Sequence, residues 1–381
     1  MRDEGMNDAT RNHPFYRRLD ERILELGGMF NAHLHLDRAG TLEERYMAST
    51  GQALDECSHV SLAKKHGLIG RLHEGPAYEA ADLERRVHSY LDTMVAARTA
   101  RADTLVDVTD DRVGLSALET LEEVRRERAG DIDLRLAAYS PLGFRDSEPG
   151  RWELFEEGAR RSDFIASLPE ADDTDDYPGN IGFDEHCRRV LALSRELGKM
   201  VHIHTDQRNE PTERGTERLI AALREHGAPV SPDSNRGEPL VWAVHAISPS
   251  TYDEARFDAL LAGLVETGIG VVCCPSAAMG MRQIRPLTTP THNSIPRVLE
   301  MLAAGVHVRV GSDNVADMCS PSTTADLRDE IFVLSGALRF YHVGVLARLA
   351  AGQRLDAAER ELVSEHLARD RAEIERALGR R

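Results

Sequence analysis

The sequence predicts an α/β protein that folds as a (β/α)8 barrel with a helical appendage at its C-terminus. Eight short apolar runs recur along the chain, and longer charged segments with apolar residues every three or four positions separate them. The runs occupy residues 28–37, 102–108, 133–140, 162–168, 199–205, 239–247, 268–274 and 305–313. Eight strand-then-helix units favour a closed parallel barrel, with an open doubly wound sheet as the rival.

The segments between the runs are unequal in length, which predicts where the barrel carries additions. Residues 38–101 form an unusually long connection, and we expect extra helices there, placed over the barrel mouth as a lid. Residues 169–180 are acidic and rich in turn residues, so we expect a loop. We divide the chain into an N-terminal extension (1–27), the barrel (28–322) and a charged C-terminal helical segment (323–381).

The composition limits the partners that the protein can have. A formal net charge of -17 over 381 residues opposes binding to nucleic acid or to an anionic membrane surface, so we expect a small-molecule substrate. No apolar run approaches the roughly 20 residues that a membrane helix needs. Five cysteines without a CxxC pair are typical of free thiols in a reducing compartment, which favours the cytoplasm. Assembly into a homo-oligomer stays open.

Several of the runs end in residues that can bind a metal ion. The first ends in His33 and His35, which the two-residue period of a strand points to the same side. Later runs end in His204, His245 and Asp313. Each alone has a simpler explanation, because a buried histidine is more often a hydrogen-bonded core residue and an aspartate in GSDN can be a turn residue. Their shared position at the carboxyl ends of strands favours an open site for Zn²⁺ or Fe²⁺.

These motifs, in their order, resemble those of the amidohydrolase superfamily, and within it the cytosine deaminase-like branch. The likeness extends from about residue 28 to about residue 328. It consists of NAHLHLDR, TLVDVTDD, MVHIHTDQ, VWAVHAISP, GVVCCPSAAMGM and GVHVRVGSDNVADM. An HxH pair alone is unspecific, whereas the ordered series is specific. The small β-sandwich that most relatives carry is not expected here, because only about 27 residues precede the first run.

The resemblance implies a ligand set for one divalent ion, either Zn or Fe. The implied ligands are His33, His35, His204 and Asp313. It also implies that His245 lies beside the activated water without being a ligand, and that Asp313 carries a proton during catalysis. His202 falls two residues before the matched position, so we expect it to fill a layer of the barrel or to orient a neighbour. The fourth run reads FIASLPEAD and lacks the bridging lysine of two-metal members, which favours one metal.

Three positions depart from the branch in ways that affect the substrate. Gln207 stands where the deaminases have a proton-shuttling glutamate, and an amide cannot carry a proton in that way. Pro141 stands in place of the glutamine that reads cytosine, and Asn314 replaces the second of two aspartates. Cytosine is therefore not the expected substrate. Gln207 and Asn314 are instead candidate substrate-binding amides.

Arg38 follows the HLHLD motif and has two interpretations. A guanidinium there could hold a carboxylate or a carbonyl of the substrate by a bidentate pair. Alternatively, it could form an ordinary salt bridge with Glu43 or Glu44.

The function that we expect is hydrolysis of a C–N bond in a small polar nitrogen heterocycle, chiefly by deamination through a metal-bound hydroxide. Asp313 would move the proton and His245 would stabilise the developing charge. An amidase or cyclic-amide ring opener with the same metal site is the alternative, and Gln207 favours it. A relative that binds a ligand without turnover is a third interpretation, which the complete ligand set opposes.

Overall fold

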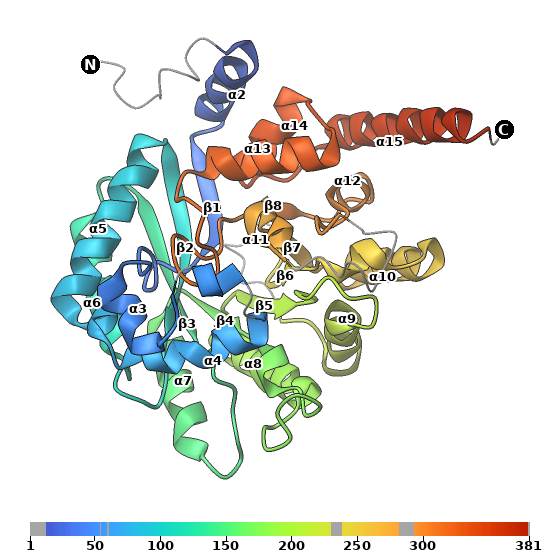
Figure 1. Cartoon of the computed structure of the whole chain (residues 1–381). Helices are drawn as coiled ribbons and strands as arrows, with labels where there is room; N and C mark the ends of the chain where they lie inside the picture. Colours follow the sequence, from blue (N-terminus) through green and yellow to red (C-terminus); the bar gives the residue numbers. More distant parts are fainter. Residues whose placement is uncertain (1–12, 54, 59–60, 230–237, 282–292, 380–381) are drawn as a thin grey trace.

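The computed structural model describes residues 13–53, 55–58, 61–229, 238–281 and 293–379, and Figure 1 shows their arrangement. In these ranges eight parallel strands form one sheet in the order in which they occur along the chain. They are β1 (Met29–Leu34), β2 (Thr99–Asp107), β3 (Asp133–Tyr139), β4 (Phe164–Ser167), β5 (Val201–Thr205), β6 (Val241–His245), β7 (Gly270–Cys273) and β8 (Val308–Val310). Seven of the predicted runs contain one strand each, and the run 102–108 overlaps β2, which begins earlier at Thr99, so the predicted barrel is confirmed.

Helices surround the strands and cover the outer face of the sheet (Figure 1). They are α2 (Pro14–Glu25), α3 (Glu44–Thr50), α4 (Leu62–His73), α5 (Ala80–Ala96), α6 (Ser116–Glu127), α7 (Pro149–Arg161), α8 (Phe183–Leu197), α9 (Gly215–His226), α10 (Glu254–Thr267), α11 (Pro275–Met279), α12 (Val298–Ala303), α13 (Leu327–Leu338), α14 (Val343–Ala350) and α15 (Ala357–Ala377), with 3₁₀ helices η1 (Asp55–Ser58), η2 (Pro76–Tyr78), η3 (Pro169–Asp172) and η5 (Ser248–Thr251). Every residue of β1, β5 and β6 is buried. This is the pattern of a parallel barrel whose interior is filled with side chains.

The long connection between β1 and β2 folds into α3, η1, α4, η2 and α5, as predicted. Leu62, Lys65 and His66 of α4 line the cavity at the carboxyl end of the strands, so this helix covers the barrel mouth. The stretch 169–180, predicted as a loop, begins instead with η3, because Pro169 can start a short helix that the preceding strand leads into.

The ends of the chain pack around the first and last strands. Helix α14 contacts β1, β8 and α2, whereas α15 extends away from the barrel and buries only Val363 among its described residues (Figure 1). Residues 1–12 of the predicted N-terminal extension lie outside the described residues, and the boundary at 322/323 stays a prediction. The described residues contain no second sheet that could form a β-sandwich. None of their helices is long and apolar enough to cross a membrane.

The barrel closes through a short seam between β1 and the residues that follow β8. The backbone N–H of Asp313 donates to the carbonyl of His33 at 2.9 Å, and the N–H of His35 donates to the carbonyl of Asp313 at 3.2 Å. Below this pair, the Asn31 amide donates to the Ser312 hydroxyl at 2.8 Å and accepts from the Ser312 N–H at 3.1 Å. The hydrogen bonds that close the barrel therefore fix the relative positions of three of the four predicted ligands.

Gly311 allows the two chains of this seam to approach each other. A Cβ atom at this position would lie 2.6 Å from the carbonyl oxygen of His33 and 2.8 Å from its Cβ. These distances are too short for any other side chain, so the seam requires glycine here.

We predict that Gly311→Ala forces the seam apart and lowers the free energy of unfolding by about 1–3 kcal/mol, the usual cost of overpacking. Urea denaturation of the wild type and the variant measures this difference. Gly336→Ala in α13 is the matched control, because a Cβ there meets nothing within 4 Å and alanine favours a helix. Equal stability of Gly311→Ala and the wild type would show that the seam is not tightly packed.

Candidate metal centre and active site

Four buried side chains gather at the seam in an arrangement that can hold a metal ion. One ligand atom from each lies within 4.8 Å of the others. They are the four residues of the predicted ligand set, His33, His35, His204 and Asp313. His33 lies in β1 and His35 directly follows it. His204 lies in β5, and Asp313 follows β8. A second group in the described residues, Glu84, His88 and Glu127, is largely exposed and lies outside the barrel mouth.

The imidazoles of this cluster are held in the neutral form that binds metals. Burial lowers the pKa of His33 and of His204, and the neighbouring histidines lower both further. Burial and the Arg38 cation lower the pKa of His35 to about 4. At neutral pH each ring therefore keeps a lone pair, which protonation would remove.

Hydrogen bonds to the second ring nitrogen orient two of these imidazoles. The Nδ1–H of His204 donates to the Ser167 carbonyl at 2.9 Å, which leaves Nε2 for the cluster. The Nδ1 atoms of His33 and His202 lie 3.3 Å apart and share a hydrogen bond. His33 Nε2 is buried and has no hydrogen-bond partner in the part of the chain that the structure describes. A divalent ion fits this donor set, because it would satisfy that nitrogen while the second shell fixes the rings. This contact of His202 with His33 is compatible with the predicted role of orienting a neighbour, which stays a prediction.

Asp313 faces the two histidines of β1. Its Oδ1 lies 3.4 Å from His35 Nε2 and 3.7 Å from His33 Nε2. Burial alone would raise the pKa of this carboxyl, but the hydrogen bond with His35 and the nearby imidazoles lower it overall, so Asp313 is ionised. Its backbone lies in the left-handed region at φ 58°, as does that of His245 at φ 78°. Such a conformation is rare for a histidine and is found mainly where a functional side chain must be aimed.

His245 lies beside the cluster at the end of β6. Its ring centroid is 5.3 Å from that of His204, and burial lowers its pKa, so it is neutral. Its Nδ1 is buried and has no partner within the described residues. His245 is therefore placed to contact a molecule bound at the cluster, which matches the position implied by the resemblance.

Arg38 is buried under the cluster, and the predicted salt bridge with Glu43 or Glu44 is wrong. Its guanidinium contacts Asp107 at the end of β2, with N–O distances of 3.4 and 3.3 Å. It also donates to His35 Nδ1 at 2.6 Å and to Asn314 Oδ1 at 3.3 Å. The residue after HLHLD points into the barrel mouth, toward the strand that neighbours β1, whereas Glu43 is exposed and pairs with Arg45.

The three predicted substrate-binding residues, Arg38, Gln207 and Asn314, line the same recess as the histidine cluster. This recess is bordered by His35, Arg38, Tyr139, His204, Gln207, His245, Asp313 and Asn314, and by His66 of α4. It adjoins a larger cavity of about 820 Å³, which shares its residues Leu62, His66 and Met281. That volume suits a small organic molecule.

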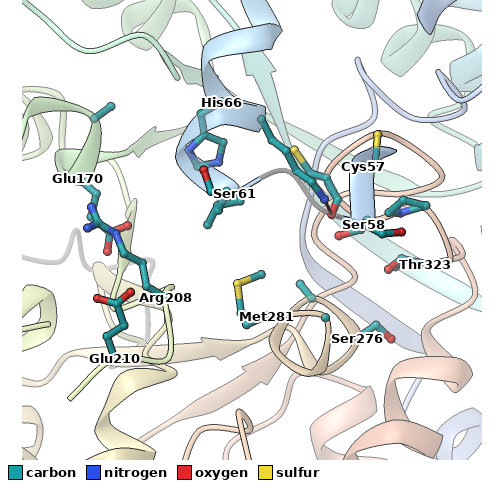
Figure 2. A pocket seen from close by; sticks show the side chains of 18 of the residues that line it. Cys57, Ser58, Ser61, His66, Glu170, Arg208, Glu210, Ser276, Met281 and Thr323 are labelled. Atoms are coloured by element: carbon teal, nitrogen blue, oxygen red, sulfur yellow. Dashed lines mark hydrogen bonds between the residues drawn. The ribbon is translucent and has the colours of Figure 1, made fainter. Parts of the chain in front are cut away.

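Three residues that the sequence did not point to border the larger cavity. Figure 2 shows Glu170, Arg208 and Glu210 along one side of the larger cavity, with His66 near the middle of the view. Glu170 comes from η3, immediately after β4, and its Oε2 accepts a hydrogen bond from Gln207 Nε2 at 2.7 Å. No spacing in the sequence pairs residues 170 and 207, because the pairing depends on the adjacency of β4 and β5.

The hydrogen bond between His202 and His33 leads to a testable prediction. His202→Phe keeps the ring that packs against Phe164, with a centroid distance of 4.9 Å, but removes the hydrogen bond to His33. We expect metal affinity to fall roughly 10- to 100-fold, as is usual for loss of a second-shell partner, while the fold remains. Competition with a chelator followed by metal analysis measures the affinity. His226→Phe at the end of α9 is the control, and unchanged affinity of His202→Phe would contradict the prediction.

Comparison with known proteins first gives sequence relatives. No protein-family model matches the chain. An uncharacterized protein of Haemophilus influenzae is 26% identical over 300 residues, which cover 78% of this chain and 98% of that protein. A pterin deaminase of Rhizobium rhizogenes is 23% identical over 311 residues, which cover 82% of this chain and 64% of the deaminase.

Solved structures with the same fold include hydrolases that act on heterocycles. The 5-methylcytosine deaminase of Klebsiella pneumoniae, liganded with 5-fluorocytosine, aligns with a TM-score of 0.68 and 22% identity, covering 85% of this chain and 72% of that one. The atrazine chlorohydrolase of Arthrobacter aurescens, complexed with zinc, aligns with a TM-score of 0.51 and 12% identity, covering 86% and 72%. The chain therefore has the barrel fold of these hydrolases, which is the fold that the predicted resemblance implied.

Proposed function

We propose that the protein is a metal-dependent hydrolase that removes an amino group from a small polar nitrogen heterocycle. The observation that carries this proposal is the buried cluster of three neutral imidazoles and one ionised carboxylate, with His245 beside it, at the bottom of a polar recess. Deaminases among the relatives and structural neighbours support the same chemistry.

The donor set indicates which ion the cluster holds. Three nitrogen donors and one carboxylate oxygen suit Zn²⁺ or Fe²⁺ better than Mg²⁺ or Ca²⁺, which prefer oxygen. We propose one ion, held by His33, His35, His204 and Asp313, because among the described residues no further carboxylate or lysine joins the group. When bound, such an ion lowers the pKa of water to about 7 and so supplies a nucleophile at neutral pH.

The residues of the chain would then handle the protons and the developing charge. Ionised Asp313 can accept a proton from the attacking water and later give it to the leaving nitrogen. His245, neutral and without a partner at Nδ1, can hydrogen-bond the oxygen on which charge develops.

The polar side chains of the recess suit a substrate edge with both a donor and an acceptor. Gln207 donates to Glu170, so its carbonyl oxygen remains to accept a hydrogen bond from the substrate. Asn314 accepts from Arg38, so its amide N–H remains to donate. Amino-substituted nitrogen heterocycles present such an edge. Arg38 is held by Asp107 and His35, and we propose that it contacts the substrate through the edge of its guanidinium at the recess.

We also propose that the substrate is a free small molecule and that the enzyme acts in the cytoplasm. The formal net charge of -17 opposes polyanionic partners, and the cavity is of small-molecule size. Assembly into a homo-oligomer is compatible with this function and is not required by the site, because one chain supplies all four ligands.

We predict that ammonia is released from at least one compound in a panel of aminopyrimidines, aminotriazines, pterins and cyclic amides. Cyclic amides would open without releasing ammonia, so ammonia assays together with product mass distinguish deamination from ring opening.

We predict that Asp313→Asn lowers turnover at least about 100-fold, because it removes both a proposed ligand and the proton carrier. Asp326→Asn at the start of α13 is the control. Turnover by metal-free protein, or full activity of Asp313→Asn, would refute the proposed mechanism.

A further inference from the structure

Deamination of a ring carbon requires a proton for the ring nitrogen as well as one for the leaving amine. Asp313 can carry only one of the two at a time, and position 207 holds an amide that cannot carry a proton. The recess must therefore obtain its second acid from another residue. Among the described residues that line the recess itself, Asp313 is the only carboxyl group.

Glu170 is the candidate for this second acid. It follows β4, the strand next to β5, and its Oε2 accepts a 2.7 Å hydrogen bond from the side chain of Gln207. Gln207 lines the metal recess, while Glu170 lines the adjoining cavity, so the pair lies where the two spaces meet. Glu170 does not belong to the cluster of proposed metal ligands, so its carboxyl group is available for proton transfer. Figure 2 shows its side chain at the cavity wall beside Arg208.

The surroundings of Glu170 suit proton exchange near neutral pH. Burial and the Asp206 carboxylate raise the pKa of Glu170. The hydrogen bond from Gln207 and the Arg208 cation lower it, and together these effects raise the pKa to about 7. The other facing carboxyl, Glu213, has its pKa raised to about 9 by burial and by Glu170, so it is protonated at neutral pH. A general acid works best when its pKa lies near the working pH.

We propose that Glu170 is the carboxyl group that protonates the ring nitrogen of the substrate, in the role that the resemblance assigns to a glutamate at position 207. In the deaminases of this branch the group extends from the end of β5. Here the same wall of the active site receives its carboxyl from the end of β4, and Gln207 holds it in place. The inference rests on the proposed deamination.

The proton balance of the reaction closes with these two carriers. The water oxygen forms a bond to the ring carbon, the C=N electron pair moves to the ring nitrogen, and that nitrogen takes the proton of Glu170. Asp313 takes one proton from the water and gives it to the amino nitrogen as the C–N bond breaks. The remaining hydroxyl proton returns to Glu170 as the carbonyl forms. Substrate and water become the ring carbonyl compound and ammonia, with both residues restored.

The decisive variants are Glu170→Gln and the exchange Glu170→Gln with Gln207→Glu. Glutamine at 170 has the same shape and can still pair with Gln207, so a purely structural role would survive the change. We expect Glu170→Gln to lower kcat roughly 10²- to 10⁴-fold, the usual contribution of general acid catalysis. The exchange returns the carboxyl to position 207 and should recover most of this loss. Asp173→Asn, at the end of η3 and paired with Arg218, is the matched control.

The assay uses whichever panel compound releases ammonia from the wild type, with metal content measured for every variant. Unchanged kcat in Glu170→Gln, or a rise in KM alone, would overturn the inference, because either shows that no proton passes through Glu170. Loss of kcat in Glu170→Gln without recovery in the exchanged protein would overturn the proposal that the carboxyl can act from either strand.

A second measurement separates this inference from the proposed function. Difference infrared spectra of wild type and Glu170→Gln should show a protonated carboxyl band that is lost as the pH rises through about 7. If no panel compound is deaminated, the proposed function fails while this titration still decides whether Glu170 can exchange a proton in the neutral range. Absence of the band, in an active enzyme or an inactive one, overturns the inference.

Discussion

The backbone pairing of Asp313 with His33 and His35 is the constraint on which the rest of the site depends. These two hydrogen bonds close the barrel and at the same time set the spacing of three ligands from opposite ends of the sequence. The pairing requires the close approach that Gly311 permits and the left-handed backbone that Asp313 adopts. Closure of the barrel therefore also brings together three of the four proposed ligands.

The charges around the cluster are arranged to keep its imidazoles neutral. Arg38 is buried, and a positive charge in that position needs compensation. Asp107 provides it, and Asp107 is held in turn by His73 and Tyr78 through hydrogen bonds of 3.0 and 2.8 Å. The network joins Arg38, which follows β1, to Asp107 of β2, His73 of α4 and Tyr78 of η2, so the segment that covers the barrel mouth is connected to the histidine cluster by polar contacts. The recess is therefore lined by neutral imidazoles, by the amides of Gln207 and Asn314, and by the one paired cation of Arg38 among its described residues.

The fold and the clustering of the four proposed ligands could be predicted because each rests on a pattern that recurs at the strands. Alternation along β1 points His33 and His35 the same way, and the carboxyl ends of parallel strands meet at one end of a barrel. The partners of these residues could not be predicted in the same way. One of the two interpretations of Arg38 was a salt bridge with Glu43 or Glu44 nearby in sequence, yet it pairs with Asp107, which only the packing of β2 against β1 brings into reach.

Glu170 illustrates the same limit for catalytic chemistry. In its segment, FIASLPEAD, the sequence indicates only that a bridging lysine is missing, and no motif marks the glutamate. Gln207 indicated a missing acid, but only the neighbouring ends of β4 and β5 show where a replacement can come from. A substitution at one strand end is thus best interpreted together with the side chains at the adjacent strand ends.

The most direct test of the account is a crystal structure of the purified protein with anomalous diffraction data collected above and below the metal absorption edge. The account predicts one anomalous peak, bound by His33, His35, His204 and Asp313, with His245 facing it and Glu170 outside its ligand shell. A second metal peak in the barrel mouth, or a metal held by a different set of side chains, would contradict it.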